Sequence, residues 1–120
     1  MITQKRELGD LGEKLAGEYL EGKGYAIIDR NYSTKFGEID IIAKKGGALL
    51  FVEVKTSSHA SVLPEENITF RKLKCLLKTI EIYLMDNGVD YVWQLDSIAV
   101  LMDKETRKAQ IRHLKNINIR

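Results

Sequence analysis

The chain has 120 residues, of which 44% are hydrophobic and 30% charged, so it can bury one core and is predicted to form one domain over residues 1–120. Its single proline and its lack of low-complexity runs exclude a disordered linker. A net charge of +2, from 19 basic and 17 acidic residues, excludes a dedicated polyanion binder but allows an acidic centre surrounded by bases.

Cysteine content and hydropathy indicate the compartment. Cys75 is the only cysteine, so no intrachain disulfide can form, and its place on the apolar side of a predicted helix favours a core residue over a nucleophile. No apolar run reaches the length of a membrane span, and residues 1–6 lack the apolar stretch of a secretory signal. The expected location is the reducing cytoplasm, with no membrane partner.

Hydrophobic periodicity predicts two helices and five strands. The expected elements are, in chain order, a helix over Gln4–Glu21, strands over Tyr25–Tyr32, Glu38–Ala43 and Ala48–Thr56, a helix over Glu65–Asn87, and strands over Asp90–Met102 and Arg107–Ile119. Most strands adjoin in the sequence, so the sheet should be mixed with helices on its faces, which is an α/β fold.

One hairpin carries the strongest signal. Two apolar-rich runs flank Gly46-Gly47, and a Gly-Gly pair in that setting is typical of a two-residue turn. Counting outward from the turn places Asp40 opposite Glu53. The Cβ atoms of directly paired residues are roughly 4.5–5.5 Å apart, so the two carboxylates should share one face.

Two facing carboxylates call for a cation. Asp40 and Glu53 lie between apolar neighbours, and they would repel in a half-buried setting unless a cation separated them. Oxygen ligands of this kind suit Mg²⁺ or Mn²⁺. Lys55 shares the face of Glu53 and could activate water or stabilise a charged phosphate, so the set predicts metal-assisted phosphodiester hydrolysis. The alternative is a solvated strand face on which Glu38 forms an ordinary ion pair with Lys55, its partner in the same register.

Residues 37–40, Gly-Glu-Ile-Asp, and residues 51–55, Phe-Val-Glu-Val-Lys, resemble the PD-(D/E)XK nuclease signature. The form is that of the YraN-like family of small uncharacterised bacterial proteins, which is similar to archaeal-type Holliday-junction resolvases. The resemblance extends from about Leu8 to about Leu84, with Ile39 where proline often precedes the aspartate. It implies a restriction-endonuclease-like α-β-β-β-α-β core.

The resemblance also implies roles for residues of the hairpin. Asp40 and Glu53 would bind the metal, together with the backbone carbonyl of Val54. Lys55 would activate water or stabilise the pentacoordinate phosphate.

A third acidic residue enters through the first predicted helix. By periodicity Glu13 is a solvated residue at the edge of the apolar stripe. Residues 9–16 match the family's G-x-G-E-x-x-A run, which makes Glu13 a further metal ligand or an outer-shell group. Gly9 and Gly12 weaken a helix, so this turn is expected to pack closely against the sheet.

A basic row follows on the second predicted helix. Arg71, Lys74 and Lys78 recur at helical spacing, and Lys72 lies beside them. Such a row is commonly a solvated face, and the alternative is a surface that contacts DNA phosphates beside the hairpin. Lys72 also matches a lysine of the family's second helix.

Three functions stay open. The first is a divalent-metal-dependent endonuclease acting on DNA, with branched or structured DNA as a candidate substrate and a homodimer expected by resemblance to resolvases. The second is a nucleic-acid-binding protein on a nuclease-like scaffold that does not cleave on its own. The third is a structural adaptor whose charged hairpin face is an ion-pair network. His59, His113 and Asp96 are assigned no chemistry.

Overall fold

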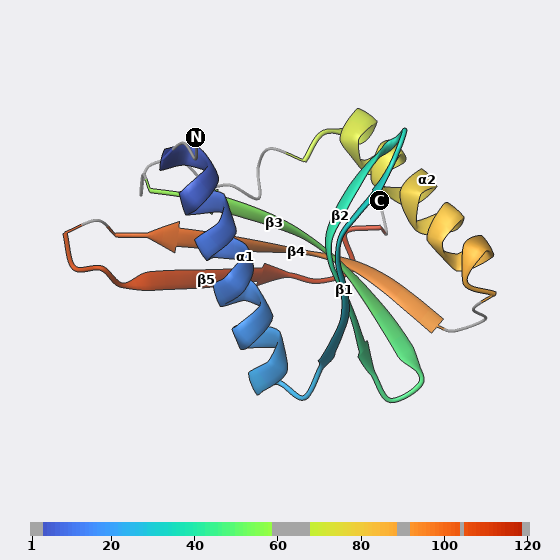
Figure 1. Ribbon diagram of the computed structural model, residues 1–120, viewed down its shortest axis with the longest axis horizontal. Coiled ribbons are helices and arrows are strands. Elements are labelled where there is room, and N and C mark those ends of the chain that lie inside the picture. The colour runs from blue at the N-terminus through green and yellow to red at the C-terminus, as the bar shows by residue number, and fades with distance from the viewer. Residues whose placement is uncertain (1–3, 59–67, 89–91, 104, 119–120) are drawn as a thin grey trace.

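Figure 1 shows a twisted sheet between two helices, from a computed structural model that describes residues 4–58, 68–88, 92–103 and 105–118. The elements are α1 (Gln4–Gly22), β1 (Ala26–Thr34), β2 (Gly37–Lys45), β3 (Ala48–Ser57), α2 (Phe70–Asp86), β4 (Val92–Met102) and β5 (Ala109–Leu114). Within these ranges the sheet order is β1-β2-β3-β4-β5, with β3 and β4 parallel and the other neighbours antiparallel. The predicted α/β fold with a mixed sheet and an α-β-β-β-α-β order is confirmed.

Each face of the sheet packs against one helix. α1 places Ala16 and Leu20 against one face of the strands, whose buried residues are Ile41, Ala43, Leu50, Val52, Ile98 and Val100. α2 contributes Leu73, Leu76 and Ile80 to a second cluster, whose strand residues are Ile39, Ile42, Leu49, Phe51 and Leu95. Burying each large aliphatic side chain stabilises the fold by about 1.5–3 kcal/mol. In the described ranges neither helix is long and apolar enough to cross a membrane.

The β2–β3 hairpin has the predicted register. Gly46 and Gly47 form the two-residue turn, and Gly46 has a φ of 60°, which favours glycine. Ile42 pairs with Phe51, and the ladder ends one step further on, at Ile41 and Val52. Beyond that step the two strands separate. In Figure 1 the β1–β2 hairpin runs toward α2, whereas β3 continues beside β4.

Most of the predicted elements have bounds that differ from the observed ones by one residue or more. α2 begins at Phe70 because Thr69, in an extended conformation, caps the helix by accepting a hydrogen bond from the amide of Lys72 at 3.1 Å. β5 is limited to Ala109–Leu114, because Arg107 and Asn116 flank it in the left-handed region, each with a φ of 57°. β1 extends two residues beyond its predicted end. Residues 59–67, which include His59 and the predicted start of the second helix, lie outside the described residues.

The glycines of α1 differ in their surroundings. A Cβ atom added at Gly12 would overlap the side chain of Thr56 on β3, so the predicted close approach of helix and sheet is confirmed there. A Cβ atom added at Gly9 would meet nothing within 4 Å, so the same prediction is wrong for Gly9. Only the second glycine sits on the side of the helix that faces β3.

This contrast predicts opposite effects of two matched substitutions. We expect Gly12→Ala to lower the free energy of unfolding by about 1–3 kcal/mol, because Thr56 must move to admit the methyl group. We expect Gly9→Ala to raise it by about 0.5–1 kcal/mol, because alanine has the better helix propensity and meets no neighbour. Urea unfolding of the two variants measures both changes, and a change of the same sign in both would contradict the packing described here.

Candidate functional site

The point where β2 separates from β3 is occupied by a carboxylate. The backbone amide of Val54 on β3 donates a hydrogen bond to Oδ2 of Asp40 on β2, over 2.7 Å. This bond stands just past the last ladder pair, Ile41 and Val52, where a backbone carbonyl would otherwise accept. The side chain of Asp40 is therefore held in the fork between the two strands.

Glu53 lies next to Asp40 but has cationic partners. It is only 5% exposed, and its Oε1 is 2.6 Å from Nζ of Lys72 on α2 and 3.7 Å from Nζ of Lys55. Burial lowers the pKa of Lys55, and the neighbouring ammonium of Lys72 lowers it further. Burial, the largest single effect, acts in the same direction on Lys72, but its hydrogen bonds to Glu53 and Lys55 and the negative charges of Glu53 and Asp40 together outweigh burial and raise the pKa of Lys72. The structure thus brings together Asp40, Glu53, Lys55 and Lys72.

Of the two carboxylates, Asp40 is the one whose negative charge its surroundings disfavour. Burial, followed by the negative charge of Glu53, raises the pKa of Asp40 to about 7, and the hydrogen bond from Val54 only partly opposes them. Glu13 and Glu38 push the pKa in the same upward direction. No described lysine or arginine forms an ion pair with Asp40, whereas Glu53 has two such partners.

Two further acids gather beside this fork. In the amide orientation that satisfies both carboxylates, the side-chain nitrogen of Asn31 on β1 donates to Oε1 of Glu38 at 3.0 Å and to Oε1 of Glu13 at 3.1 Å. Ser33 donates to the other oxygen of Glu38 at 3.2 Å. Burial raises the pKa of Glu13, and the charge of Glu38 adds to the rise. Asn31, which has a φ of 53°, therefore links Glu13 on α1 to Glu38 on β2.

The alternative ion pair between Glu38 and Lys55 is not formed. Within the described residues Glu38 is bound by Ser33 and Asn31, and Lys55 is 3.7 Å from Glu53 instead. The reason is the separation of the strands, because the register that would place Glu38 opposite Lys55 ends at Ile41. From the sequence, Asn31 is a polar residue between the first two predicted strands that could reach a phosphate. Its contacts with Glu13 and Glu38 were not predicted, and its tolerance of a left-handed backbone was one available signal.

The donor set is compatible with a small divalent cation. In the described part of the chain no three His, Cys, Asp or Glu side chains are placed to hold a metal ion together. The candidate donors are therefore the pair Asp40 and Glu53, and Mg²⁺ commonly uses one or two carboxylates and keeps several waters. An uncompensated carboxylate beside a second one is also the environment that a cation stabilises. The residues present therefore fit Mg²⁺ or Mn²⁺.

The predicted basic row is divided between two environments. Arg71, Lys74 and Lys78 are exposed along α2, and Lys78 lies 3.9 Å from Glu81 one turn away. Lys72 points inward to Glu53 at 2.6 Å. A role for any of the four in contacting DNA stays a prediction.

A separate polar network lies on the α1 side of the sheet. Asp96 is fully buried, and its carboxylate contacts Nε2 of His113 at 2.6 Å while accepting from the amide of Asn116 and the side chain of Gln94. Burial alone would raise the pKa of Asp96, but these hydrogen bonds hold it below its usual value. The hydroxyl of Tyr19 extends the network to α1 at 2.9 Å from His113. Asp96 therefore fastens β4, β5 and α1 together and takes no part in the acidic fork.

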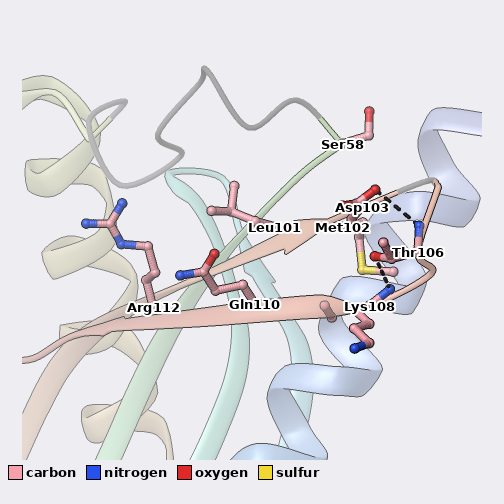
Figure 2. A pocket seen from close by; sticks show the side chains of 9 residues that line it. Ser58, Leu101, Met102, Asp103, Thr106, Lys108, Gln110 and Arg112 are labelled. Carbon is pink, nitrogen blue, oxygen red and sulfur yellow. Dashed lines mark hydrogen bonds between the residues drawn. The ribbon is translucent and has the colours of Figure 1, made fainter.

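A groove at the β4–β5 hairpin is also distinct from the fork. It has a volume of about 640 Å³ and is lined by Ser58 and by residues of the β4–β5 hairpin, as Figure 2 shows. Its carboxylate, that of Asp103, accepts hydrogen bonds from the amides of Glu105 and Thr106 and so stabilises the turn. Among the described residues that line the groove, Asp103 is the one that carries a carboxylate.

Fold and site together define a class of protein. A mixed five-stranded sheet in the described residues, a helix on either face and acids at a strand fork form an α/β protein consistent with a restriction-endonuclease-like core. The profile of "Uncharacterised protein family UPF0102" matches residues 12–100, and the chain belongs to this family, which is the YraN-like family.

Relatives from two bacterial genera support that placement. A UPF0102 protein of Alkaliphilus metalliredigens is 42% identical over 104 residues, which cover 85% of this chain and 91% of the relative. One from Alkaliphilus oremlandii is 38% identical over 113 residues, covering 92% and 97%. One from Clostridium botulinum Loch Maree is 35% identical over 114 residues, covering 92% and 93%.

The raised pKa of Asp40 predicts an inverted pH dependence of stability. Because the pKa is higher in the folded state, the folded protein binds more protons between pH 3.8 and about 7, and its stability falls as the pH rises through that window. Without divalent cations, we expect Asp40→Asn to raise the free energy of unfolding at pH 8 by about 2–4 kcal/mol. The gain should disappear near pH 4.

Chemical unfolding at several pH values measures this effect. Glu105→Gln, which removes an exposed carboxylate from the β4–β5 turn, is the control and should follow the wild type. Parallel pH profiles for wild type and Asp40→Asn would show that Asp40 carries no buried charge.

Proposed function

We propose that this protein is a divalent-metal-dependent endonuclease acting on DNA. One observation carries the proposal: Asp40 is held in the strand fork beside Glu53 with a pKa raised to about 7 and without a basic partner among the described residues. The resemblance of residues 37–40 and 51–55 to the PD-(D/E)XK signature supports the same function. The family placement by itself specifies no activity.

The proposed ligands converge on the fork. Asp40 and Glu53 would hold Mg²⁺ or Mn²⁺, and the Val54 carbonyl is the third candidate donor. In an extended strand the N–H and C=O of one residue point to the same neighbour, so this carbonyl faces the side on which Val54 donates to Asp40. When bound, the metal would supply the Lewis acid that polarises a phosphodiester. Glu13 and Glu38, which Asn31 joins, would add negative charge near the metal.

Lys55 is the proposed proton-transfer or charge-stabilising group. Its pKa is lowered by burial and by Lys72, so its ammonium releases a proton more readily than that of a solvated lysine. Its position 3.7 Å from Glu53 places it at the edge of the ligand pair, where a phosphate oxygen would approach. Lys72 holds the side chain of Glu53 at the fork in the absence of a cation.

The Lys72–Glu53 contact also favours a second candidate function. Glu53 is already neutralised at 2.6 Å, so a cation must compete with an ammonium for its oxygen. A nuclease-like scaffold that binds nucleic acid without cleaving on its own would keep this ion pair. An adaptor with a purely structural ion-pair network explains Glu53 but not Asp40, which has no described basic partner.

Metal binding separates these possibilities. We expect isothermal titration with Mn²⁺ or Mg²⁺ to show binding by the wild type and none by Asp40→Asn, since the substitution removes one of two charged ligands. Carbon-13 NMR of the Asp40 carboxyl should show its pKa falling when the cation is added, because an opposite charge favours the ionised form. Glu81→Gln, on the exposed side of α2, should bind like the wild type. An unchanged Asp40 pKa at saturating cation would remove the metal site.

Cleavage is tested by a second pair of variants. With Mn²⁺ and either supercoiled or branched DNA, we expect Lys55→Ala to reduce the rate on the order of 10²-fold, as for loss of one preorganised charge-stabilising group. Lys108→Ala, in the groove at the β4–β5 hairpin, should cleave at the wild-type rate. Equal rates for wild type and Lys55→Ala would assign the cleavage to a contaminant and favour the binding-only function.

A further inference from the structure

A second cavity borders the acidic fork. It has a volume of about 400 Å³ and lies between the tip of the β1–β2 hairpin and the beginning of α2. Its walls include Phe36, Cys75 and Leu76, with the charged residues Glu38, Arg71 and Lys72. Ligand pockets of about 300–1,000 Å³ commonly combine an apolar wall with a few polar groups. Lys72 lines the cavity and also contacts Glu53 at the fork, so the cavity and the fork are contiguous.

The outer wall of this cavity is the exposed ring of Phe36, and the ammonium groups of two lysines lie near this ring. Phe36, at the hairpin tip, is 37% exposed. Nζ of Lys35 lies 5.3 Å from the ring centroid, and Nζ of Lys78 on α2 lies 5.8 Å from it. An exposed phenylalanine at a turn loses the benefit of burial, and here it is placed where a planar ligand can contact it.

A second aromatic residue continues the pattern along α2. Phe70 is 74% exposed, and Nζ of Lys74 lies 5.6 Å from its ring centroid. Lys74 and Lys78 are one helical turn apart, so Phe70, Lys74, Lys78 and Phe36 form a strip in which two cationic groups lie between two aromatic rings. We call these four residues the aromatic strip.

We propose that the aromatic strip and its cavity bind unpaired nucleotides of a DNA strand, with the base that enters the cavity stacked on Phe36. This assignment rests on the proposed function and specifies its substrate as single-stranded or branched DNA rather than continuous duplex. Sequence-tolerant single-strand binding uses a cationic track for phosphates and aromatic side chains on which bases stack. The strip supplies both.

Two features favour an unpaired strand over duplex or a protein partner. In a duplex the faces of the bases are covered by their neighbours, so an exposed ring such as Phe36 gains nothing from stacking there. Lys35, Arg71, Lys74 and Lys78 place four cations around the strip, against two nearby acids: Glu38 in the cavity wall, and Glu81, which is paired with Lys78. This charge is complementary to a polyanion.

The cavity lies next to the proposed reaction centre, so a strand bound in the cavity would extend toward that centre. Lys72 belongs to its wall and contacts Glu53 at 2.6 Å. The carboxylate of Glu38 stands in the wall as an acceptor, which suits an N–H donor on the pairing edge of a base, such as N3–H of thymine. A nucleotide bound there places its adjoining phosphate on the side of Lys72, Glu53 and Asp40.

The test measures binding apart from cleavage. Fluorescence anisotropy compares a labelled oligothymidine with a duplex of equal length, using Asp40→Asn as the background and no divalent cation. We expect the single strand to bind about tenfold more tightly than the duplex, and Phe36→Leu to reduce single-strand affinity about tenfold while changing duplex affinity little. Phe36→Tyr should retain the preference because it keeps the aromatic face.

Control variants guard against misfolding and simple electrostatics. Met85→Ala removes a 74% exposed apolar side chain at the other end of α2 and should bind like the background protein. Lys74→Gln should weaken single-strand and duplex binding alike and flatten their salt dependence. Thermal unfolding of each variant identifies any that fails to fold, and Phe36→Tyr then decides in place of Phe36→Leu.

The outcomes distinguish this inference from the proposed nuclease function. No binding to oligothymidine, equal affinity for both DNAs, or an unaltered affinity in a folded Phe36→Leu would overturn the inference even where Mn²⁺ supports cleavage. A selective loss in Phe36→Leu supports it even where the metal titration and the cleavage assay both fail.

Discussion

The hydrogen bond from the Val54 amide to Asp40 is the contact on which the site depends. It lies where the β2–β3 ladder ends. The amide of Val54 on β3, which would otherwise donate to a backbone carbonyl, donates to the side chain of Asp40 on β2 instead. Holding the carboxylate there brings it beside Glu53 and away from water. Both effects raise the pKa of Asp40 to about 7. The separation of β2 from β3 is thus the structural cause of the raised pKa of Asp40.

The two central acids differ in how their charge is balanced. Glu53 has Lys72 at 2.6 Å and Lys55 at 3.7 Å, whereas Asp40 has one backbone amide. Because Lys72 comes from α2, the packing of that helix against the sheet also determines the charge state of the centre. The same helix contributes walls of the adjoining cavity, so core packing and the candidate function share one element.

Asp96 shows what a structural buried acid looks like in this fold. It has three hydrogen-bonding partners, and its pKa lies below the usual value. Its charge is compensated within the protein, and it ties β5 to β4. Asp40 has a raised pKa instead, which is the state expected of a buried carboxylate whose charge the described residues do not balance. The two acids therefore differ in how fully their carboxylates are hydrogen-bonded, and not in burial alone.

The sequence by itself determined the helix-and-strand order, the Gly46-Gly47 turn and hence the hairpin register as far as Ile41 and Val52, because these depend on local spacing and a two-residue strand period. Only the tertiary structure decided the partners that span distant elements. Lys72 on α2 turns to Glu53, and Asn31 joins Glu13 to Glu38. No periodicity encodes such contacts, because they arise from how strands separate and helices pack once the chain has folded. The predicted pairing of Glu38 with Lys55 failed for that reason.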